Sequence, residues 1–308
     1  MLLAVQTPSP IFRFEADGFW LNLHHFLYVL GRAQNQAPDA QRRAVVGAPA
    51  DQENGLKGQS AVTIQDWQSA VRFYADGLSK RDAVFDDDLI AVTNAMRVPS
   101  NARPEALKID PALRATLIRA STVYRDVWWK KHQAENHATV RSCQRLLEQH
   151  GDNVLRYITH AYQLEWPTGG HLINVVAYAN WAGAYSTDGG LIVIASLDEG
   201  TKGTLGLESM FHESMHQWDQ PMMARLSKLA QEHHTPSPRE GITHALIWYT
   251  AAEAVKRAIP DHVGYAERGG MWKQKQMGSF KRGLDTYWKP YLDGKIALDE
   301  ALLGVLKS

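Results

Sequence analysis

The sequence has little cysteine, because Cys143 is the only one among 308 residues. A single thiol excludes a disulfide within the chain and excludes any zinc site built from several cysteine ligands. The redox compartment of the protein is therefore left open, and a metal site in this chain needs histidine or carboxylate ligands.

An excess of charge is also missing, because 33 basic residues balance 33 acidic residues. Proteins that bind nucleic acid or anionic membrane surfaces ordinarily carry a basic excess, so neither partner is indicated. The hydrophobic share of 44% is sufficient for a sizeable core. At this length, the chain is expected to form one large or two modest domains.

Long apolar runs are absent, and none approaches the roughly 18 residues that a membrane-spanning helix needs. We therefore expect no membrane span. The opening residues, 1–6, are too short for the apolar core of a signal peptide, but they fit the end of a trimmed one. Localisation is left open, with export to the periplasm or the outside as one reading.

Helical patterns dominate the first half of the chain. Apolar residues at three-and-four spacing predict an amphipathic helix over residues 19–30. The adjacent His24 and His25 on it diverge by about 100° and cannot chelate one ion together, so we interpret them as polar decoration of a packed helix. A long helical region is predicted over residues 111–166.

Two other segments of the first half have distinct compositions. Residues 33–60 are rich in Gln, Ala, Gly, Asp and Pro without periodicity and predict a loop. Residues 86–88 are three successive aspartates, which favour a helix start over a calcium site because no EF-hand spacing follows them.

Strand composition appears only after Trp166, at residues 172–178 and 191–196, with a turn between them. The fold class predicted is therefore α+β, mostly helical, with a small sheet preceding the segment around residue 212. We place a soft domain boundary at Trp166. It separates a helical N-terminal part at 1–166 from a catalytic part at 167–308, and the two parts need not fold apart.

The motif that organises this second part is H-E-x-x-H, formed by His212, Glu213 and His216. Residues four apart share one face of a helix, so both imidazoles can bind one metal ion while Glu213 stands beside them. The surrounding residues are strongly apolar, and uncompensated burial of polar groups costs about 1–3 kcal/mol each. A zinc site therefore explains the motif better than a core helix with hydrogen-bonded histidines.

The stretch from Gly206 to Trp218 resembles the active-site helix of the zincin metallopeptidases. The metzincin continuation is absent, because Asp219 and Met222 stand at the corresponding positions. The resemblance therefore favours the gluzincin branch, in which the third zinc ligand is a glutamate on a later helix.

A predicted helix from about Gly241 to Ile259 offers two exclusive choices for this ligand. We favour Glu253, because its small alanine neighbours permit close approach of the two helices. The alternative is Glu240 together with His244, which share a face at the start of the helix; His244 is nine residues from Glu253 and so points oppositely. The tandem His233 and His234 are the third choice, in a polar stretch typical of a solvated loop.

The remaining site residues follow from the zincin resemblance. Zincins commonly use a Tyr or His to stabilise the oxyanion, and Tyr249 and Tyr265 are the candidates, with His244 behind them. The resemblance also implies an edge strand that binds extended substrate, for which Trp181 and Ala182 are the candidates; core packing of Trp181 is the alternative.

We expect a zinc-dependent metallopeptidase that hydrolyses peptide bonds, with Zn²⁺ as its cofactor and Glu213 as its general base. Two alternatives stay open. The first is a zincin scaffold that binds a partner without turnover, and the second is a zinc hydrolase of a non-peptide amide or ester.

Overall fold

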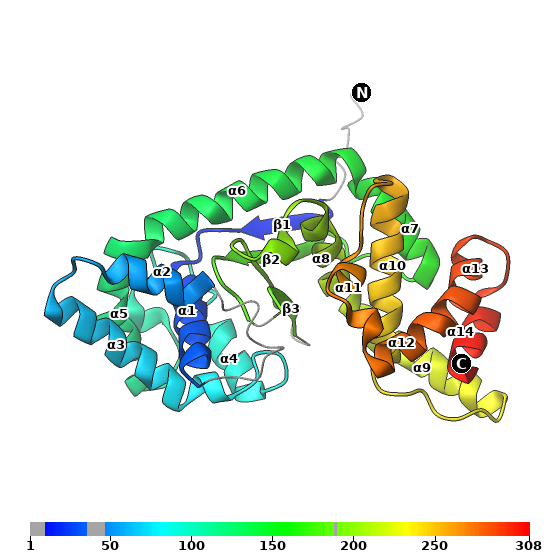
Figure 1. Cartoon of the computed structure of the whole chain (residues 1–308), viewed down its shortest axis with the longest axis horizontal. Helices are drawn as coiled ribbons and strands as arrows, with labels where there is room; N and C mark the ends of the chain where they lie inside the picture. The colour runs from blue at the N-terminus through cyan, green and yellow to red at the C-terminus, as the bar shows by residue number, and fades with distance from the viewer. Residues whose placement is uncertain (1–9, 36–46, 181, 188–189) are drawn as a thin grey trace, which may run out of the picture. The chain divides into compact units, whose positions relative to one another are not determined.

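A computed structural model describes the chain except for residues 1–9, 36–46, 181 and 188–189. The fold is α+β, mostly helical with a small four-stranded mixed sheet, as the sequence predicts (Figure 1). Two compact units are present. Unit 1 comprises Met1–Gln144 and Gly170–Lys202, and unit 2 comprises Arg145–Gly169 and Gly203–Ser308.

This division differs from the single boundary expected near residue 166. The strands that follow this residue belong with the helical N-terminal part, because β2 (His171–Val176) pairs with β1 (Phe12–Glu15) near the start of the chain. The preceding segment, Arg145–Gly169, belongs instead with the part that contains the H-E-x-x-H motif.

The sheet of unit 1 has the strand order β1-β2-β4-β3. Strand β4 (Ile192–Ala195) runs parallel to β2, which runs parallel to β1, whereas β3 (Ala184–Ser186) is the antiparallel edge strand beside β4. The two strands predicted from composition, β2 and β4, are confirmed. The short strands β1 and β3 were not predicted, since four and three residues carry too little pattern.

Unit 1 is built around helix α1 (Phe19–Gln34), which is buried without interruption from Phe19 to Gly31. Aromatic and aliphatic side chains from the helices around it and from β4 complete this core. The other helices of unit 1 are α2 (Gly47–Leu56), α3 (Ala61–Asp76), α4 (Asp87–Ala95), α5 (Pro111–Tyr124) and α6 (Lys130–Leu146, ending in unit 2), with the shorter turns η3 (Leu78–Lys80), η4 (Pro104–Ala106), η5 (Arg125–Trp129) and η7 (Glu199–Thr201).

The histidine pair of α1 lies inside this core rather than on a solvated face, which corrects the interpretation as polar decoration. His24 contacts the hydroxyls of Tyr74 and Thr93 at 2.9 and 3.1 Å. His25 contacts the carbonyl of Leu21 and the hydroxyl of Tyr185, both at 2.8 Å. Burial lowers the pKa of His25 to about 4, so both its nitrogens serve as neutral hydrogen-bonding groups at pH 7.

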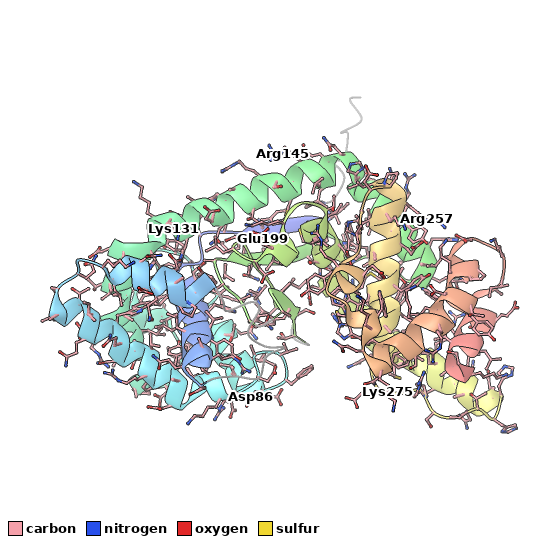
Figure 2. All side chains as sticks on the ribbon, in the orientation of Figure 1. Asp86, Lys131, Arg145, Glu199, Arg257 and Lys275 are labelled. Carbon is pink, nitrogen blue, oxygen red and sulfur yellow. The ribbon has the colours of Figure 1, made fainter. Side chains whose placement is uncertain are left out.

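The aspartate run at residues 86–88 starts a helix, as predicted. The side chain of Asp86, labelled in Figure 2, accepts a hydrogen bond from the backbone N–H of Leu89 at 2.9 Å and caps α4. Asp87 and Asp88 occupy the first turn, where the helix dipole favours negative charge. The acids are thus explained by local helix chemistry.

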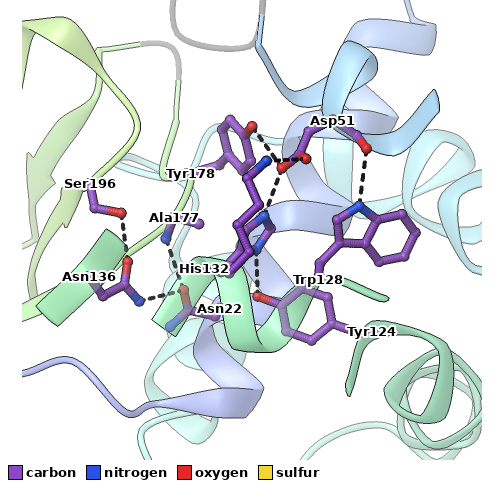
Figure 3. A network of polar contacts seen from close by, with 10 residues as sticks. Asn22, Asp51, Tyr124, Trp128, His132, Asn136, Ala177, Tyr178 and Ser196 are labelled. Carbon is purple, nitrogen blue, oxygen red and sulfur yellow. Dashed lines mark hydrogen bonds and ion pairs between the residues drawn. The ribbon is translucent and has the colours of Figure 1, made fainter. Parts of the chain in front are cut away.

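Part of the segment predicted as a loop is helix α2, which corrects that prediction for Gly47–Leu56; residues 36–46 lie outside the described part of the chain. Only Ala48 and Asp51 of this helix are buried. Its attachment is polar. The Asp51 carboxylate accepts hydrogen bonds from Lys131, His132 and Tyr178 at 2.6, 2.8 and 3.1 Å (Figure 3).

Charge explains why this contact holds an otherwise polar helix in place. Burial opposes ionisation of Asp51, but hydrogen bonds from His132 and Lys131 outweigh it and lower the pKa of the carboxyl to about 2. His132 in turn contacts the hydroxyl of Tyr124 at 2.9 Å, and the indole N–H of Trp128 donates to the carbonyl of Asp51 at 3.1 Å. No apolar periodicity marks such a helix in the sequence.

Unit 2 contains helices, turns and loops, and no strand among its described residues. Helix α10 packs against both α7 and α8. The helices of unit 2 are α7 (Asp152–Tyr162), α8 (Gly203–Met215), α9 (Asp219–Glu232), α10 (Ile242–Ala258), α11 (Tyr265–Arg268), α12 (Lys275–Gly283), α13 (Lys289–Leu292) and α14 (Leu298–Lys307), with the shorter turns η6 (Leu147–Gly151), η8 (His216–Trp218), η9 (Met271–Lys273) and η10 (Leu284–Trp288).

Two predicted helical regions are confirmed. Helices α5, α6 and α7 and the π turns η5 and η6 follow one another from Pro111 to Tyr162, and α10 occupies Ile242–Ala258. Among the residues that the structure describes, no helix combines the length and apolar character that crossing a membrane requires.

Candidate metal centre

The two histidines of the H-E-x-x-H motif lie at the C-terminal end of α8. His212 is in the helix, and His216 begins the short 3₁₀ turn η8 that follows it. Every residue of α8 from Leu205 to Met215 is buried, as expected for a helix through the centre of a unit. The imidazoles of His212 and His216 lie 5.1 Å apart between ring centroids, so they share one face.

A third imidazole joins this pair from α10. The Nε2 atoms of His212 and His244 are 3.2 Å apart, and one ligand atom from each of His212, His216 and His244 lies within 4.8 Å of the others. Two nitrogens bound to a tetrahedral zinc at 2.0–2.1 Å lie about 3.3–3.4 Å apart. The closest pair already has nearly the spacing of zinc ligands.

Burial keeps two of these imidazoles in the form that binds a metal. Desolvation lowers the pKa of His212 well below its ordinary value, and the neighbouring His216 and His244 lower it further. Desolvation, together with His216, lowers the pKa of His244 to about 4. At neutral pH, both side chains are therefore neutral and present lone pairs rather than competing protons.

His216 has a carboxylate partner on its other nitrogen. Its Nδ1 lies 2.6 Å from Oδ2 of Asp219, the first residue of α9. A carboxylate at this position fixes the tautomer, so that Nδ1 donates its proton and the lone pair lies on Nε2, the nitrogen that can bind a metal. Asp219 therefore orients the ring of His216.

An aromatic wall covers one side of the cluster. The Trp248 ring lies 3.7 Å from the His212 ring between centroids and stacks on the Tyr265 ring at 4.9 Å. Trp248 stands four residues after His244, one turn further along α10. Its indole N–H is buried without a hydrogen-bond partner among the described residues, which leaves a donor available beside the histidines.

A buried hydrogen-bonded contact holds the Tyr265 side of this wall. Glu208, one turn before His212 on α8, is fully buried and lies 2.8 Å from Nε2 of His262. The same carboxylate accepts a hydrogen bond from the backbone N–H of Tyr265 at 2.9 Å, and His262 also contacts Thr204 at 2.9 Å. These bonds anchor the start of α11 to the helix that carries the motif.

The structure brings His244 rather than Glu253 to the two motif histidines, which corrects our choice of third ligand. Glu253 lies instead 3.6 Å from the ammonium of Lys289. The argument that His244 and Glu253 point oppositely agrees with this arrangement. The first turn of α10, which carries His244, is packed in place, because Ile242 and Ala245 there are 1% and 0% exposed.

Other candidate ligands lie away from the cluster. Glu240, which we had paired with His244, is exposed, and its carbonyl accepts a hydrogen bond from Gln276. His233 and His234 are also exposed, directly after α9, as expected for a solvated stretch. Of the alternative pair, Glu240 and His244, the structure therefore brings only His244 to the motif histidines.

The two tyrosines proposed as oxyanion donors have different surroundings. The Tyr249 hydroxyl donates to the carboxylate of Asp285 at 2.9 Å, and burial together with that carboxylate raises the pKa of the phenol far above its usual value. Tyr249 is thus engaged in a contact of its own. Tyr265 remains a candidate, because its ring belongs to the aromatic wall beside His212.

The predicted general base and substrate residues fall in two places. Glu213 follows His212 on α8 and is 8% exposed, which is compatible with a role beside the cluster. Ala182 lies in unit 1, where its backbone N–H donates to the side chain of Asn180, two residues before the edge strand β3. Trp181 lies outside the described residues, so the substrate role of both stays a prediction.

Sequence reasoning missed Asp219 and Trp248 as parts of the site. Both were detectable in principle. Asp219 stands three residues after His216, and Trp248 stands four residues after His244, so each is close along the chain to one of the clustered histidines. Neither residue could be assigned to the site from the sequence, because His244 was not yet known to be the third histidine of the cluster.

Comparison of the chain with protein-family models, with curated proteins and with solved structures gave no match.

Proposed function

We propose that this protein is a zinc-dependent hydrolase that cleaves peptide bonds. The observation that carries the proposal is the convergence of His212, His216 and His244, with their ligand atoms within 4.8 Å of one another, next to Glu213. Three histidines with one open coordination position are a recurrent arrangement of catalytic zinc sites.

The donor set fits zinc in three respects. Imidazole nitrogens are ligands that Zn²⁺ prefers, and two of these imidazoles are held neutral by burial. The remaining imidazole, that of His216, is oriented by Asp219. Zinc bound by neutral ligands keeps its double positive charge, and it supplies the polarisation that brings the pKa of water towards about 7.

The residues of the chain then have distinct roles. Glu213 accepts a proton from the attacking water and returns it to the departing amine, which is general base and then general acid catalysis. Asp219 holds His216 in one tautomer. The Trp248 indole N–H, which has no hydrogen-bond partner among the described residues, is a donor for a substrate carbonyl beside the histidines, and the Tyr265 ring stacks on this indole.

The test combines metal analysis with peptide cleavage. Purified protein is expected to contain about one zinc per chain, and cleavage profiling on a peptide library should reveal hydrolysis that a chelator abolishes. Glu213→Gln should retain the metal and lose about 10²–10⁴ in rate, because an amide cannot accept the proton. Asp261→Asn, an exposed acid of the same unit, is the matched control and should cleave normally.

Each unfavourable result has a distinct meaning. Stoichiometric zinc without cleavage of any peptide would replace the peptidase with a binding scaffold or with a hydrolase of other amides or esters. Undiminished cleavage by Glu213→Gln would remove this residue from the mechanism. Absence of bound zinc, with no cleavage on adding it, would refute the proposal.

A further inference from the structure

Unit 2 contains a cavity of about 690 Å³ that the metal centre does not use. Nine described residues line it, and four of them are basic: Arg239, Lys273, Lys275 and Arg282. None of the lining residues is acidic. Since the whole chain has no net charge, this is a local concentration of positive charge rather than a reflection of composition.

Among the residues that the structure describes, none of these four cations forms an ion pair with an aspartate or glutamate side chain. In contrast, Lys281 on the same helix α12 pairs with Asp285 at 2.7 Å. Like charges gathered around one cavity repel one another, and an anion inside the cavity relieves that repulsion.

Part of the cavity wall is held in place by the protein itself. The Arg239 guanidinium lies 4.4 Å from the centre of the Phe280 ring and donates to the hydroxyl of Ser279 at 3.1 Å. It also donates to the backbone oxygen of Ser308, the last residue of the chain, at 3.2 Å, which still leaves donors of its planar fork for a ligand. A fixed guanidinium costs less entropy on binding than a mobile one.

Close backbone packing brings two of the lysines to the same cavity. Lys273 ends the turn η9, and Lys275, labelled in Figure 2, begins α12. Between these elements, a side chain at Gly278 would meet the backbone carbonyl of Trp272 at 2.7 Å, so glycine permits their approach. At the start of α12, Gln274 makes no capping side-chain bond, which leaves first-turn N–H groups able to face an anion.

We propose that this cavity binds a small molecule that carries more than one phosphate group. Four positive charges exceed what a single carboxylate can neutralise, whereas each phosphate monoester carries about −1.5 to −2 at pH 7. Guanidinium and helix N–H groups are donors that match phosphate oxygens, and the volume is within the roughly 300–1,000 Å³ of small-molecule sites.

Calorimetric titration of the full chain with inorganic pyrophosphate and with ADP tests this proposal. Both are expected to bind, and Lys273→Gln with Lys275→Gln should weaken binding at least about tenfold, since charge-assisted hydrogen bonds are lost. The matched control is Lys228→Gln with Lys256→Gln, which removes two exposed charges of the same unit and should bind like the wild type. Thermal melting checks that both double variants are folded.

Four results would overturn the proposal. One is the absence of binding by both probes, and another is equal weakening in the pocket and control variants. The third is equally tight binding of citrate, which would assign the cavity to carboxylates. Because pyrophosphate also binds zinc, the titration is repeated with His244→Ala. Unchanged affinity is expected, and lost affinity in a folded variant would place the anion at the histidine cluster and refute the cavity.

Discussion

Replacing the third histidine distinguishes the metal centre proposed from the structure from the one favoured on sequence grounds. We expect His244→Ala to weaken zinc binding strongly and Glu253→Ala to leave it unchanged. The reason is geometric, because Nε2 of His244 lies 3.2 Å from Nε2 of His212, whereas Glu253 faces Lys289. The two positions belong to the same helix, so a general effect on α10 would appear in both variants.

The magnitude follows from the share of each ligand in zinc binding. Structural zinc sites with four ligands have apparent binding free energies of about 10–16 kcal/mol, which is roughly 2.5–4 kcal/mol per ligand. Loss of His244 should therefore weaken zinc binding about 10²–10³-fold. Loss of Glu253 removes an ion pair that is partly exposed and worth less than about 1 kcal/mol, so stability should hardly change.

Competition of each variant with a chromophoric chelator measures the dissociation constant directly. Thermal melting of the metal-free proteins shows whether the fold is kept. Wild-type zinc affinity in His244→Ala would contradict the three-histidine site. A loss in Glu253→Ala as large as that in His244→Ala would show that the distance between the histidine nitrogens does not identify the ligand.

Three further predictions concern residues around the site and in unit 1. Asp219→Asn should weaken zinc binding about 10–100-fold, because it releases the ring of His216, and this isosteric change should leave the melting temperature unchanged. Chelator competition with the wild type and with this variant measures the difference in zinc affinity. Acidification should destabilise the protein through His25. The pKa of this group is about 4 in the folded chain and about 6.5 in the unfolded chain, so between these values only the unfolded chain gains a proton. Between pH 7.5 and pH 4.5, this group therefore lowers the free energy of unfolding by about 2.5 kcal/mol. Denaturant unfolding of His25→Gln should show a pH dependence that is smaller by that amount, and an identical dependence would refute the assignment. Asp51→Ala should destabilise the docking of α2 by about 3 kcal/mol, because it leaves the buried partners of this carboxylate unpaired. Hydrogen exchange of the backbone amides of residues 47–56 should become faster accordingly. Unchanged protection of these amides would contradict a polar attachment of the helix.

The sequence was informative wherever a pattern is local. Periodicity predicted α1 and α10, strand composition predicted β2 and β4, and the motif spacing placed His212 and His216 on one face. Each of these features depends on residues that are neighbours along the chain.

Features that depend on tertiary packing were not predictable in the same way. Helical geometry showed that His244 and Glu253 point oppositely, but not which face of α10 meets α8. Helix α2 has no apolar periodicity, and its position depends on Asp51 reaching Lys131 and His132, eighty and eighty-one residues away. Such contacts leave no local signal.

The pairing of β1 with β2 has a consequence for synthesis on the ribosome. Phe12 is in register with His171, so the partner of β1 emerges 159 residues later. At about 5–20 residues per second, β1 waits roughly 8–32 s without its neighbour strand. Unit 1 therefore cannot complete its sheet as an early co-translational intermediate, and the nascent chain keeps an unpaired strand while most of unit 1 and the first segment of unit 2 are being made.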